Sequence, residues 1–188
     1  MQQLVLPDKV TWFVDLQKRD SELLPKSLYK RVTRKNYLEG IDFEVVSSKR
    51  ISDLFLPEYE RLILGRKDFR LDPLITRKKM YEMSENREYE LLWFRDLISN
   101  NFLGGIVVHI LPNEIRVAYR CFDHLRTKSL RIPEADYYAE MLLHEYARRK
   151  KIYSLCHGND HHPITQMGLS IPWQESPCLL RLERNACT

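Results

Sequence analysis

Three strand-like segments lie close together in the middle of the chain, at residues 89–96, 101–111 and 114–122. Only two short turns separate them, and turns of this length join neighbouring antiparallel strands into hairpins. The middle segment is apolar almost throughout from 102 to 110, which is typical of a strand buried in a sheet. The centre of the fold is therefore predicted to be an antiparallel meander of three strands.

A long helix is predicted directly after the meander. Pro133, Glu134 and Asp136 open it, and it runs to about Lys151 through a basic last turn, the charge distribution that the helix dipole favours. The elements expected after this helix are a strand at 152–156, a loop at 157–160, a short helix at 163–167 and a last strand at 178–183.

The part of the chain before the meander is predicted to mix helices and strands. Leu24, Leu28 and Val32 recur at helical spacing, so residues 21–37 are predicted to form one helix that ends before Gly40. The other elements expected here are strands at 11–16 and 41–46, a helix at 51–64 and a charged loop at 66–87.

Size and composition indicate one globular domain over residues 1–188. Of the 188 residues, 44% are hydrophobic and 30% are charged, which excludes a disordered or fibrous chain. No apolar run approaches the roughly 20 residues that a membrane span needs. Asp8 and Asp15 stand where a secretory signal would be basic and then apolar, so we expect a cytoplasmic protein. Without a paired spacing, free thiols are expected at Cys121, Cys156, Cys178 and Cys187.

A cluster of basic side chains lies near the start of the chain, although the formal net charge is only +4. Five positive charges and no acid fall between Lys26 and Lys35. Such a cluster is typical of the solvated face of an amphipathic helix. It also fits contact with the phosphates of tRNA or of a nucleotide-linked sugar, with Tyr29 and Tyr37 as stacking groups. The sequence leaves both interpretations open.

Three segments carry a family resemblance: the basic sequence at 24–36, the glycine-containing strand at 101–108, and the stretch from His157-Gly158-Asn159-Asp160 to Met167-Gly168-Leu169. Together with the order of elements, they resemble the GNAT superfamily of acyltransferases and its FemAB-like branch of peptidoglycan-bridge aminoacyl transferases. The resemblance covers residues 24–184, with 1–23 as an N-terminal extension. It implies an α/β (α+β) fold with a mixed, mostly antiparallel central sheet flanked by helices.

The resemblance also bears on the acyl donor. GNAT enzymes that use acyl-coenzyme A usually carry a glycine loop after the strand that corresponds to 114–122, where backbone amides cradle the pyrophosphate. Here residues 120–131 contain no glycine, and Arg126, Lys128 and Arg131 are the groups that would hold phosphates by charge. FemAB-like enzymes that take an aminoacyl group from tRNA are similar in lacking a strict loop. Acetyl- or another acyl-coenzyme A and aminoacyl-tRNA are therefore both candidate donors.

The stretch after the strand 152–156 is rich in groups that N-acyl transfer needs. The reaction requires a base that makes the amine neutral, and histidine suits that task near neutral pH. His161 is the first choice for the base and His157 the second, with Asp160 orienting a neighbouring imidazole. Asn159 would offer an amide to the pantetheine of the donor. The alternative interpretation is a polar loop whose histidines only bond the backbone.

Asp123 and His124 follow the strand 114–122 and are the other catalytic candidates. In a GNAT-like fold they would lie across the gap between two strands and help to hold the amine; a surface ion pair is the alternative. Cys156 and the nearby histidines lack the ligand spacing of a structural zinc site, so no metal is expected.

The leading functional hypothesis is an N-acyltransferase that moves an acyl group from acyl-coenzyme A to an amine of a small metabolite or sugar. One alternative is an aminoacyl-tRNA-dependent transferase of the FemAB type, and another is a catalytically inactive GNAT-like binding domain. A second copy of the chain is a candidate partner, because the last strand, Trp173 and Phe69 offer edges to cover. A gap between strands 114–122 and 152–156 would favour an enzyme, and side chains filling that gap would favour the inactive domain.

Overall fold

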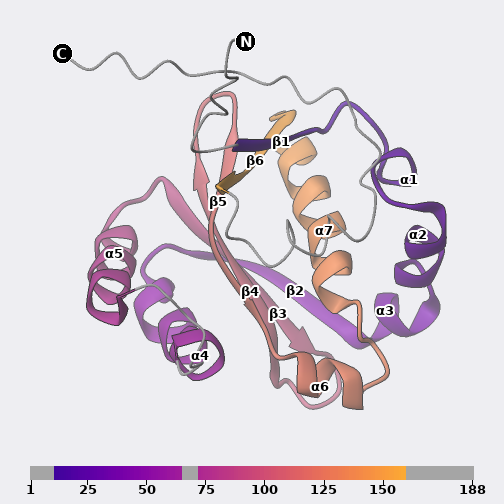
Figure 1. Ribbon diagram of the computed structural model, residues 1–188, viewed down its shortest axis with the longest axis horizontal. Helices are drawn as coiled ribbons and strands as arrows, with labels where there is room; N and C mark the ends of the chain where they lie inside the picture. The colour runs from indigo at the N-terminus through magenta and orange to yellow at the C-terminus, as the bar shows by residue number, and fades with distance from the viewer. Residues whose placement is uncertain (1–10, 65–71, 160–188) are drawn as a thin grey trace, which may run out of the picture.

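The computed structural model describes residues 11–64 and 72–159 of the chain. Its strands are β1 (Thr11–Asp15), β2 (Ile41–Ser47), β3 (Tyr89–Asp96), β4 (Phe102–Ile110), β5 (Ile115–Phe122) and β6 (Ser154–Asn159). They form one sheet in the order β1-β6-β5-β4-β3-β2 (Figure 1). Every neighbouring pair is antiparallel except β5 and β6, which are parallel. The predicted mixed, mostly antiparallel sheet is confirmed, and β3, β4 and β5 are the predicted meander.

Each face of the sheet is covered by helices and buries its own apolar core. On one face, α7 (Ala135–Arg149) contributes Leu143 to a core that also contains Ile106 of β4. On the other face, the core includes Phe55 and Met80. It is covered by α5 (Pro73–Glu85) and by one helix made of η1 (Ile51–Phe55), α4 (Leu56–Tyr59) and η2 (Glu60–Leu64), whose first and last turns are wide π turns. The helix predicted at 51–64 is confirmed. None of the helices in the two described stretches of chain is long and apolar enough to cross a membrane.

Two consecutive glycines on β4 let aromatic rings of both cores pack directly against the strand. A Cβ atom at Gly104 would lie 2.2 Å from the ring of Phe122, and one at Gly105 would lie 2.8 Å from the ring of Phe55. Because the two side chains would point to opposite faces, a larger residue at either position would displace a buried ring. The glycines are therefore required by packing, on both faces of the strand.

The single helix predicted at 21–37 is wrong. The structure has three short helices there: α1 (Asp20–Leu23), α2 (Lys26–Val32) and α3 (Lys35–Gly40). Pro25 cannot donate a backbone hydrogen bond and disfavours the helical conformation at the residue before it, and Leu24 is extended with ψ of 146°. Leu24, Leu28 and Val32 are nevertheless buried, so the apolar spacing identified the packed face and missed the breaks.

Two helices were missed by the sequence analysis. The charged stretch at 66–87 contains α5, which begins after Asp72, whose carboxylate accepts a hydrogen bond from the Leu74 amide at 2.8 Å. Its buried side chains include Thr76 and Ser84, so no apolar periodicity marks it. The second missed helix is α6 (His124–Ser129), which directly follows β5.

The boundaries of β6 also differ from the prediction. The strand was expected at 152–156 with a loop from 157, whereas β6 runs from Ser154 to Asn159. It is held on its other side by β1, which pairs with it antiparallel from Asp15↔Ser154 to Thr11↔Asn159. The segment expected to be an extension before residue 24 therefore supplies the edge strand that fixes His157 within a sheet.

Candidate active site

The two parallel strands β5 and β6 separate soon after they meet. Their ladder pairs only Ile115 and Arg116 of β5 with β6. Directly beyond these residues, Ala118 is an extra residue in the ladder between β4 and β5. Such a bulge bends its strand, so β5 turns away from β6 toward the carboxyl ends of both strands. Ligands of open α/β sheets tend to bind at carboxyl ends of this kind, which makes the gap a candidate active site.

A stripe of ionisable side chains on α7 lies beside this gap. Asp136, Glu140, His144 and Arg148 are spaced four residues apart, so they lie on one face of the helix. The first three are buried, and Arg148 is partly buried. Charged residues are rarely buried unless they are paired. The sequence analysis chose none of these four as a site residue, although their spacing on the predicted helix is a signal that the sequence contained.

Glu140 is the centre of the stripe, with a side chain only 1% exposed. Its carboxylate lies 3.0 Å from Arg120 Nη1 of β5 and 2.9 Å from His157 Nε2 of β6, and 3.3 Å from His144 Nε2. Several of these contacts are poorly aligned as hydrogen bonds, so the attraction between Arg120 and the carboxylate is mainly that of an ion pair. Burial alone would raise the pKa of Glu140, but the neighbouring His157 and Arg120 lower it well below its ordinary value.

His157 spans the gap between the strands through contacts at both ring nitrogens. Arg120 Nη2 lies 2.9 Å from Nδ1, and Nε2 faces Glu140. Because a guanidinium only donates, Nδ1 must accept, and the ring proton then sits on Nε2, toward the carboxylate. His157 is therefore held by protein groups on both sides. To take a proton from a substrate at Nδ1, it would first have to release Arg120.

The stripe continues to the surface through Asp20 and Arg148. Asp20 accepts from His144 Nδ1 at 2.7 Å and from both terminal nitrogens of Arg148 at 3.0 Å. Burial lowers the pKa of His144, but its contacts with Asp20 and Glu140 raise it more, so the pKa lies above its ordinary value. Asp20 and Arg148 line a surface pocket of about 660 Å³. A continuous row of charged side chains thus joins this pocket to the gap.

The raised pKa of His144 predicts how stability depends on pH. A group whose pKa is higher in the folded state stabilises the fold fully below its unfolded pKa of about 6.5, and this contribution is lost as pH rises through the folded pKa. We expect the free energy of unfolding to fall as pH rises above about 6.5, measured by urea denaturation. A His144→Asn variant should lack this part of the slope; an identical slope in that variant would contradict the prediction.

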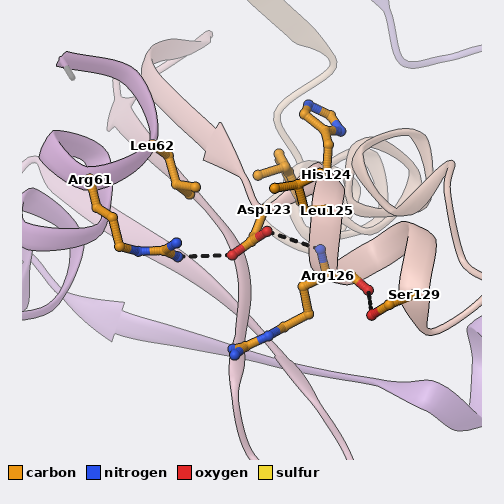
Figure 2. A pocket seen from close by; sticks show the side chains of 8 residues that line it. Arg61, Leu62, Asp123, His124, Leu125, Arg126 and Ser129 are labelled. Carbon is orange, nitrogen blue, oxygen red and sulfur yellow. Dashed lines mark hydrogen bonds and ion pairs between the residues drawn. The ribbon is translucent and has the colours of Figure 1, made fainter. Parts of the chain in front are cut away.

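A second pocket, of about 620 Å³, lies at the end of β5, between η2 and α6 (Figure 2). Asp123 is at its centre and caps α6, since its carboxylate accepts from the Arg126 amide at 3.0 Å. The same carboxylate accepts from Arg61 Nη2 at 2.9 Å. Burial raises the pKa of Asp123, but the Arg126 amide and Arg61 lower it to a net value below the ordinary one. The residues that line the pocket are Arg61, Leu62, Phe122, Asp123, His124, Leu125, Arg126 and Ser129.

The structure does not bring the predicted catalytic residues into one cluster. Asp123 bonds to η2, which covers one face of the sheet, whereas His157 contacts Glu140 of α7 on the other face. His124 is exposed at the start of α6. Asp123 and His157 thus belong to two separate sites.

The remaining predicted site residues are described only in part. Asp160 and His161 lie outside the described residues, and of Asn159 only the backbone, at the end of β6, is described. Lys128 and Arg131 are exposed on and just after α6, where they follow Arg126. Over residues 11–64 and 72–159, no cluster of three histidine, cysteine or acidic side chains is arranged to hold a metal ion.

Comparison with known proteins gives structural neighbours alone, since no protein-family model and no curated protein matches the sequence. FemX superimposes with a TM-score of 0.59 at 12% identity over 81% of this chain and 54% of its own. The C-terminal domain of a putative lysylphosphatidylglycerol synthetase from Agrobacterium fabrum superimposes with a TM-score of 0.53 at 15% identity, over 80% of this chain and 46% of its own. A conserved protein of unknown function from Bacteroides thetaiotaomicron superimposes with a TM-score of 0.57 at 11% identity, over 90% of this chain and 60% of its own.

These neighbours are longer than this chain, which spans about half the length of each. At such low identity the likeness concerns the fold. The chain therefore has a fold similar to that of FemX, in agreement with the FemAB-like resemblance of its sequence.

Proposed function

We propose that this chain, alone or within a longer protein, transfers an acyl group to an amine. The observation that carries the proposal is the divergence of β5 from β6 at the Ala118 bulge, in a fold similar to FemX. The ladder between these strands ends after two pairs, so the backbone N–H and C=O groups of β5 that follow do not pair with β6 in it. Such groups bind an extended acyl donor and hold its carbonyl close to an incoming amine.

As the donor we propose an aminoacyl ester on tRNA. Acyl-coenzyme A enzymes of the superfamily that this chain resembles hold pyrophosphate on amides at the helix start after the corresponding strand. Here the carboxylate of Asp123 already accepts the Arg126 amide in that position, and it would repel a phosphate. The exposed Lys26, Lys30 and Arg34 on and beside α2 form a basic surface suited to the tRNA backbone.

Acyl-coenzyme A with a small-molecule amine acceptor is the second candidate. Arg126, Lys128 and Arg131 on and after α6 favour it, because they gather positive charge at the pocket beside Asp123. Phosphates would then be held by side chains and not by the helix amides.

Binding measurements on the purified chain distinguish the two donors. We expect aminoacylated tRNA to bind in a salt-sensitive way, with an affinity that falls roughly 50- to 150-fold between 50 and 200 mM salt if four phosphates are contacted. Acetyl-coenzyme A should give no thermal shift at concentrations up to the millimolar range. A clear shift with acetyl-coenzyme A, and none with tRNA, would reverse the choice of donor.

Charge reversal tests where the tRNA lies. Lys30→Glu combined with Arg34→Glu should weaken tRNA binding and reduce its dependence on salt. Lys79→Glu on α5 is the matched control, since this lysine is equally exposed on a different helix. Failure of every donor to bind would favour the inactive binding domain, for which the contact of Arg120 with His157 across the gap is the specific structural support.

A further inference from the structure

Four exposed apolar side chains gather at one end of the sheet. Leu97 and Ile98, in the turn between β3 and β4, are 58% and 92% exposed, and Leu125 and Leu130, in and just after α6, are 85% and 40% exposed. We call these four residues the end patch. Figure 1 shows α6 at the end of the sheet where β3 and β4 are joined. Single exposed apolar residues are ordinary, but a group of this kind marks an interaction surface.

Hydrogen bonds hold the two parts of the end patch together. The amide of Asp123, just before α6, donates to the Leu103 carbonyl of β4 at 2.9 Å. Arg126 Nη1 of α6 lies 3.3 Å from the Phe102 carbonyl, and Phe102 begins β4 directly after the turn. The helix and the turn are therefore fixed side by side.

The turn that carries Leu97 and Ile98 is built to hold its shape. The carboxylate of Asp96 accepts from the Ile98 amide at 3.1 Å and the Ser99 amide at 3.3 Å, and also from the Ser99 hydroxyl. Asn100 has a φ of 55° and donates its amide to the Asp96 carbonyl at 2.8 Å. Ile98 is thus held outward by a network of bonds, and its exposure is a fixed feature of the turn.

The α6 side of the end patch carries charges of one sign. The segment from His124 to Arg131 carries Arg126, Lys128 and Arg131 and contains no acid. On the turn side, Asp96 is buried and bonded within the turn. The exposed Glu39 precedes Gly40, whose carbonyl accepts from the Leu97 amide at 3.0 Å. Exposed aliphatic residues bordered by basic side chains are complementary to the boundary between the acyl chains and the anionic headgroups of a membrane.

We propose that the end patch docks the protein onto an anionic lipid surface. Ile98 and Leu125 enter the headgroup region, while Lys128 and Arg131 contact the lipid phosphates. The inference does not depend on the proposed donor. Leu125 and Arg126 also line the pocket beside Asp123, so a docked protein would open that pocket next to the membrane.

Vesicle flotation tests this proposal with the purified chain. We expect binding to vesicles of phosphatidylcholine and phosphatidylglycerol at 7:3 and little binding to phosphatidylcholine alone. Ile98→Glu with Leu125→Glu should lower the partition coefficient at least about tenfold, and so should Lys128→Glu with Arg131→Glu. Leu74→Glu is the matched control, since Leu74 is 70% exposed on α5 and lies outside the end patch; its binding should equal that of the wild type.

Three outcomes would overturn the proposal. Equal binding of the end-patch variants and the wild type would show that lipids bind elsewhere. A dimer in light scattering that becomes a monomer in Ile98→Glu, without lipid binding, would assign the patch to a second copy of the chain. A large fall in melting temperature for Leu125→Glu, without lipid binding by the wild type, would show that another part of the chain covers the patch.

Discussion

Replacing Glu140 with alanine is expected to lower the free energy of unfolding by about 3–5 kcal/mol, the usual cost of breaking a buried ion pair by removing one partner. Glu140 is buried and faces Arg120, His144 and His157 within 3.3 Å. Without its carboxylate, Arg120 would stay buried and lose its ion-pair partner, and water cannot easily reach it. Urea denaturation at pH 7 measures the change.

Glu145→Ala is the matched control for this prediction. Glu145 lies on the same helix and pairs with Arg149, but both side chains are mostly exposed, so its removal should cost less than about 1 kcal/mol. Glu140→Gln keeps the shape and removes the charge, and should fall between the two. An unfolding free energy of Glu140→Ala within 1 kcal/mol of the wild type would show that the stripe on α7 is hydrated and not a buried ionic network.

Replacing His161 with alanine is expected to slow acyl transfer by roughly 10²–10⁴-fold, the usual effect of removing a general base. The residue lies outside the described part of the chain, so this prediction rests on the sequence, in which His161 follows β6 and Asp160. The structure strengthens the choice of His161 over His157 in one respect, because both ring nitrogens of His157 already contact protein groups.

The rate is measured with the donor found by the binding experiments, on a variant shown to be folded. His109→Ala is the control, since His109 lies on β4, pairs with Glu88 and should change the rate less than threefold. His157→Ala tests stability instead of rate. Arg120 and Glu140 would each lose a contact with the imidazole while staying buried, so the free energy of unfolding should fall. A rate within about threefold of the wild type for His161→Ala would remove the support for an essential base.

The parts of the fold that the sequence predicted well are those in which one physical signal dominates. Residues 102–110 form a strand because they are apolar on both faces, and two tight turns leave only a meander as their arrangement. α7 was predicted because its ends carry the charges that a helix dipole favours. β6 was misplaced by about three residues, since its pairing with β1 is a long-range contact that no local pattern contains.

The parts that were missed depend on buried polar groups. α5 buries Thr76 and Ser84, and α7 buries Asp136, Glu140 and His144, so hydropathy assigns these positions to the surface. Their burial is made possible by partners far away in the sequence, such as Arg120, which no spacing along the helix reveals. The candidate site could therefore be predicted only as a location, at the ends of two strands, and its paired groups required the structure.

The pairing of β1 with β6 has a consequence for synthesis on the ribosome. In the described part of the chain, β1 forms its ladder with β6 alone, and Asp20 just after it bonds to His144 and Arg148 of α7. At 5–20 residues per second, roughly 7–30 s pass between the synthesis of Asp15 and that of its partner Ser154. The strands β2 to β5 can pair during that time, whereas β1 has no β6 to pair with until β6 has been synthesised. A chaperone that shields newly made chains would therefore be expected to act on the amino-terminal strand.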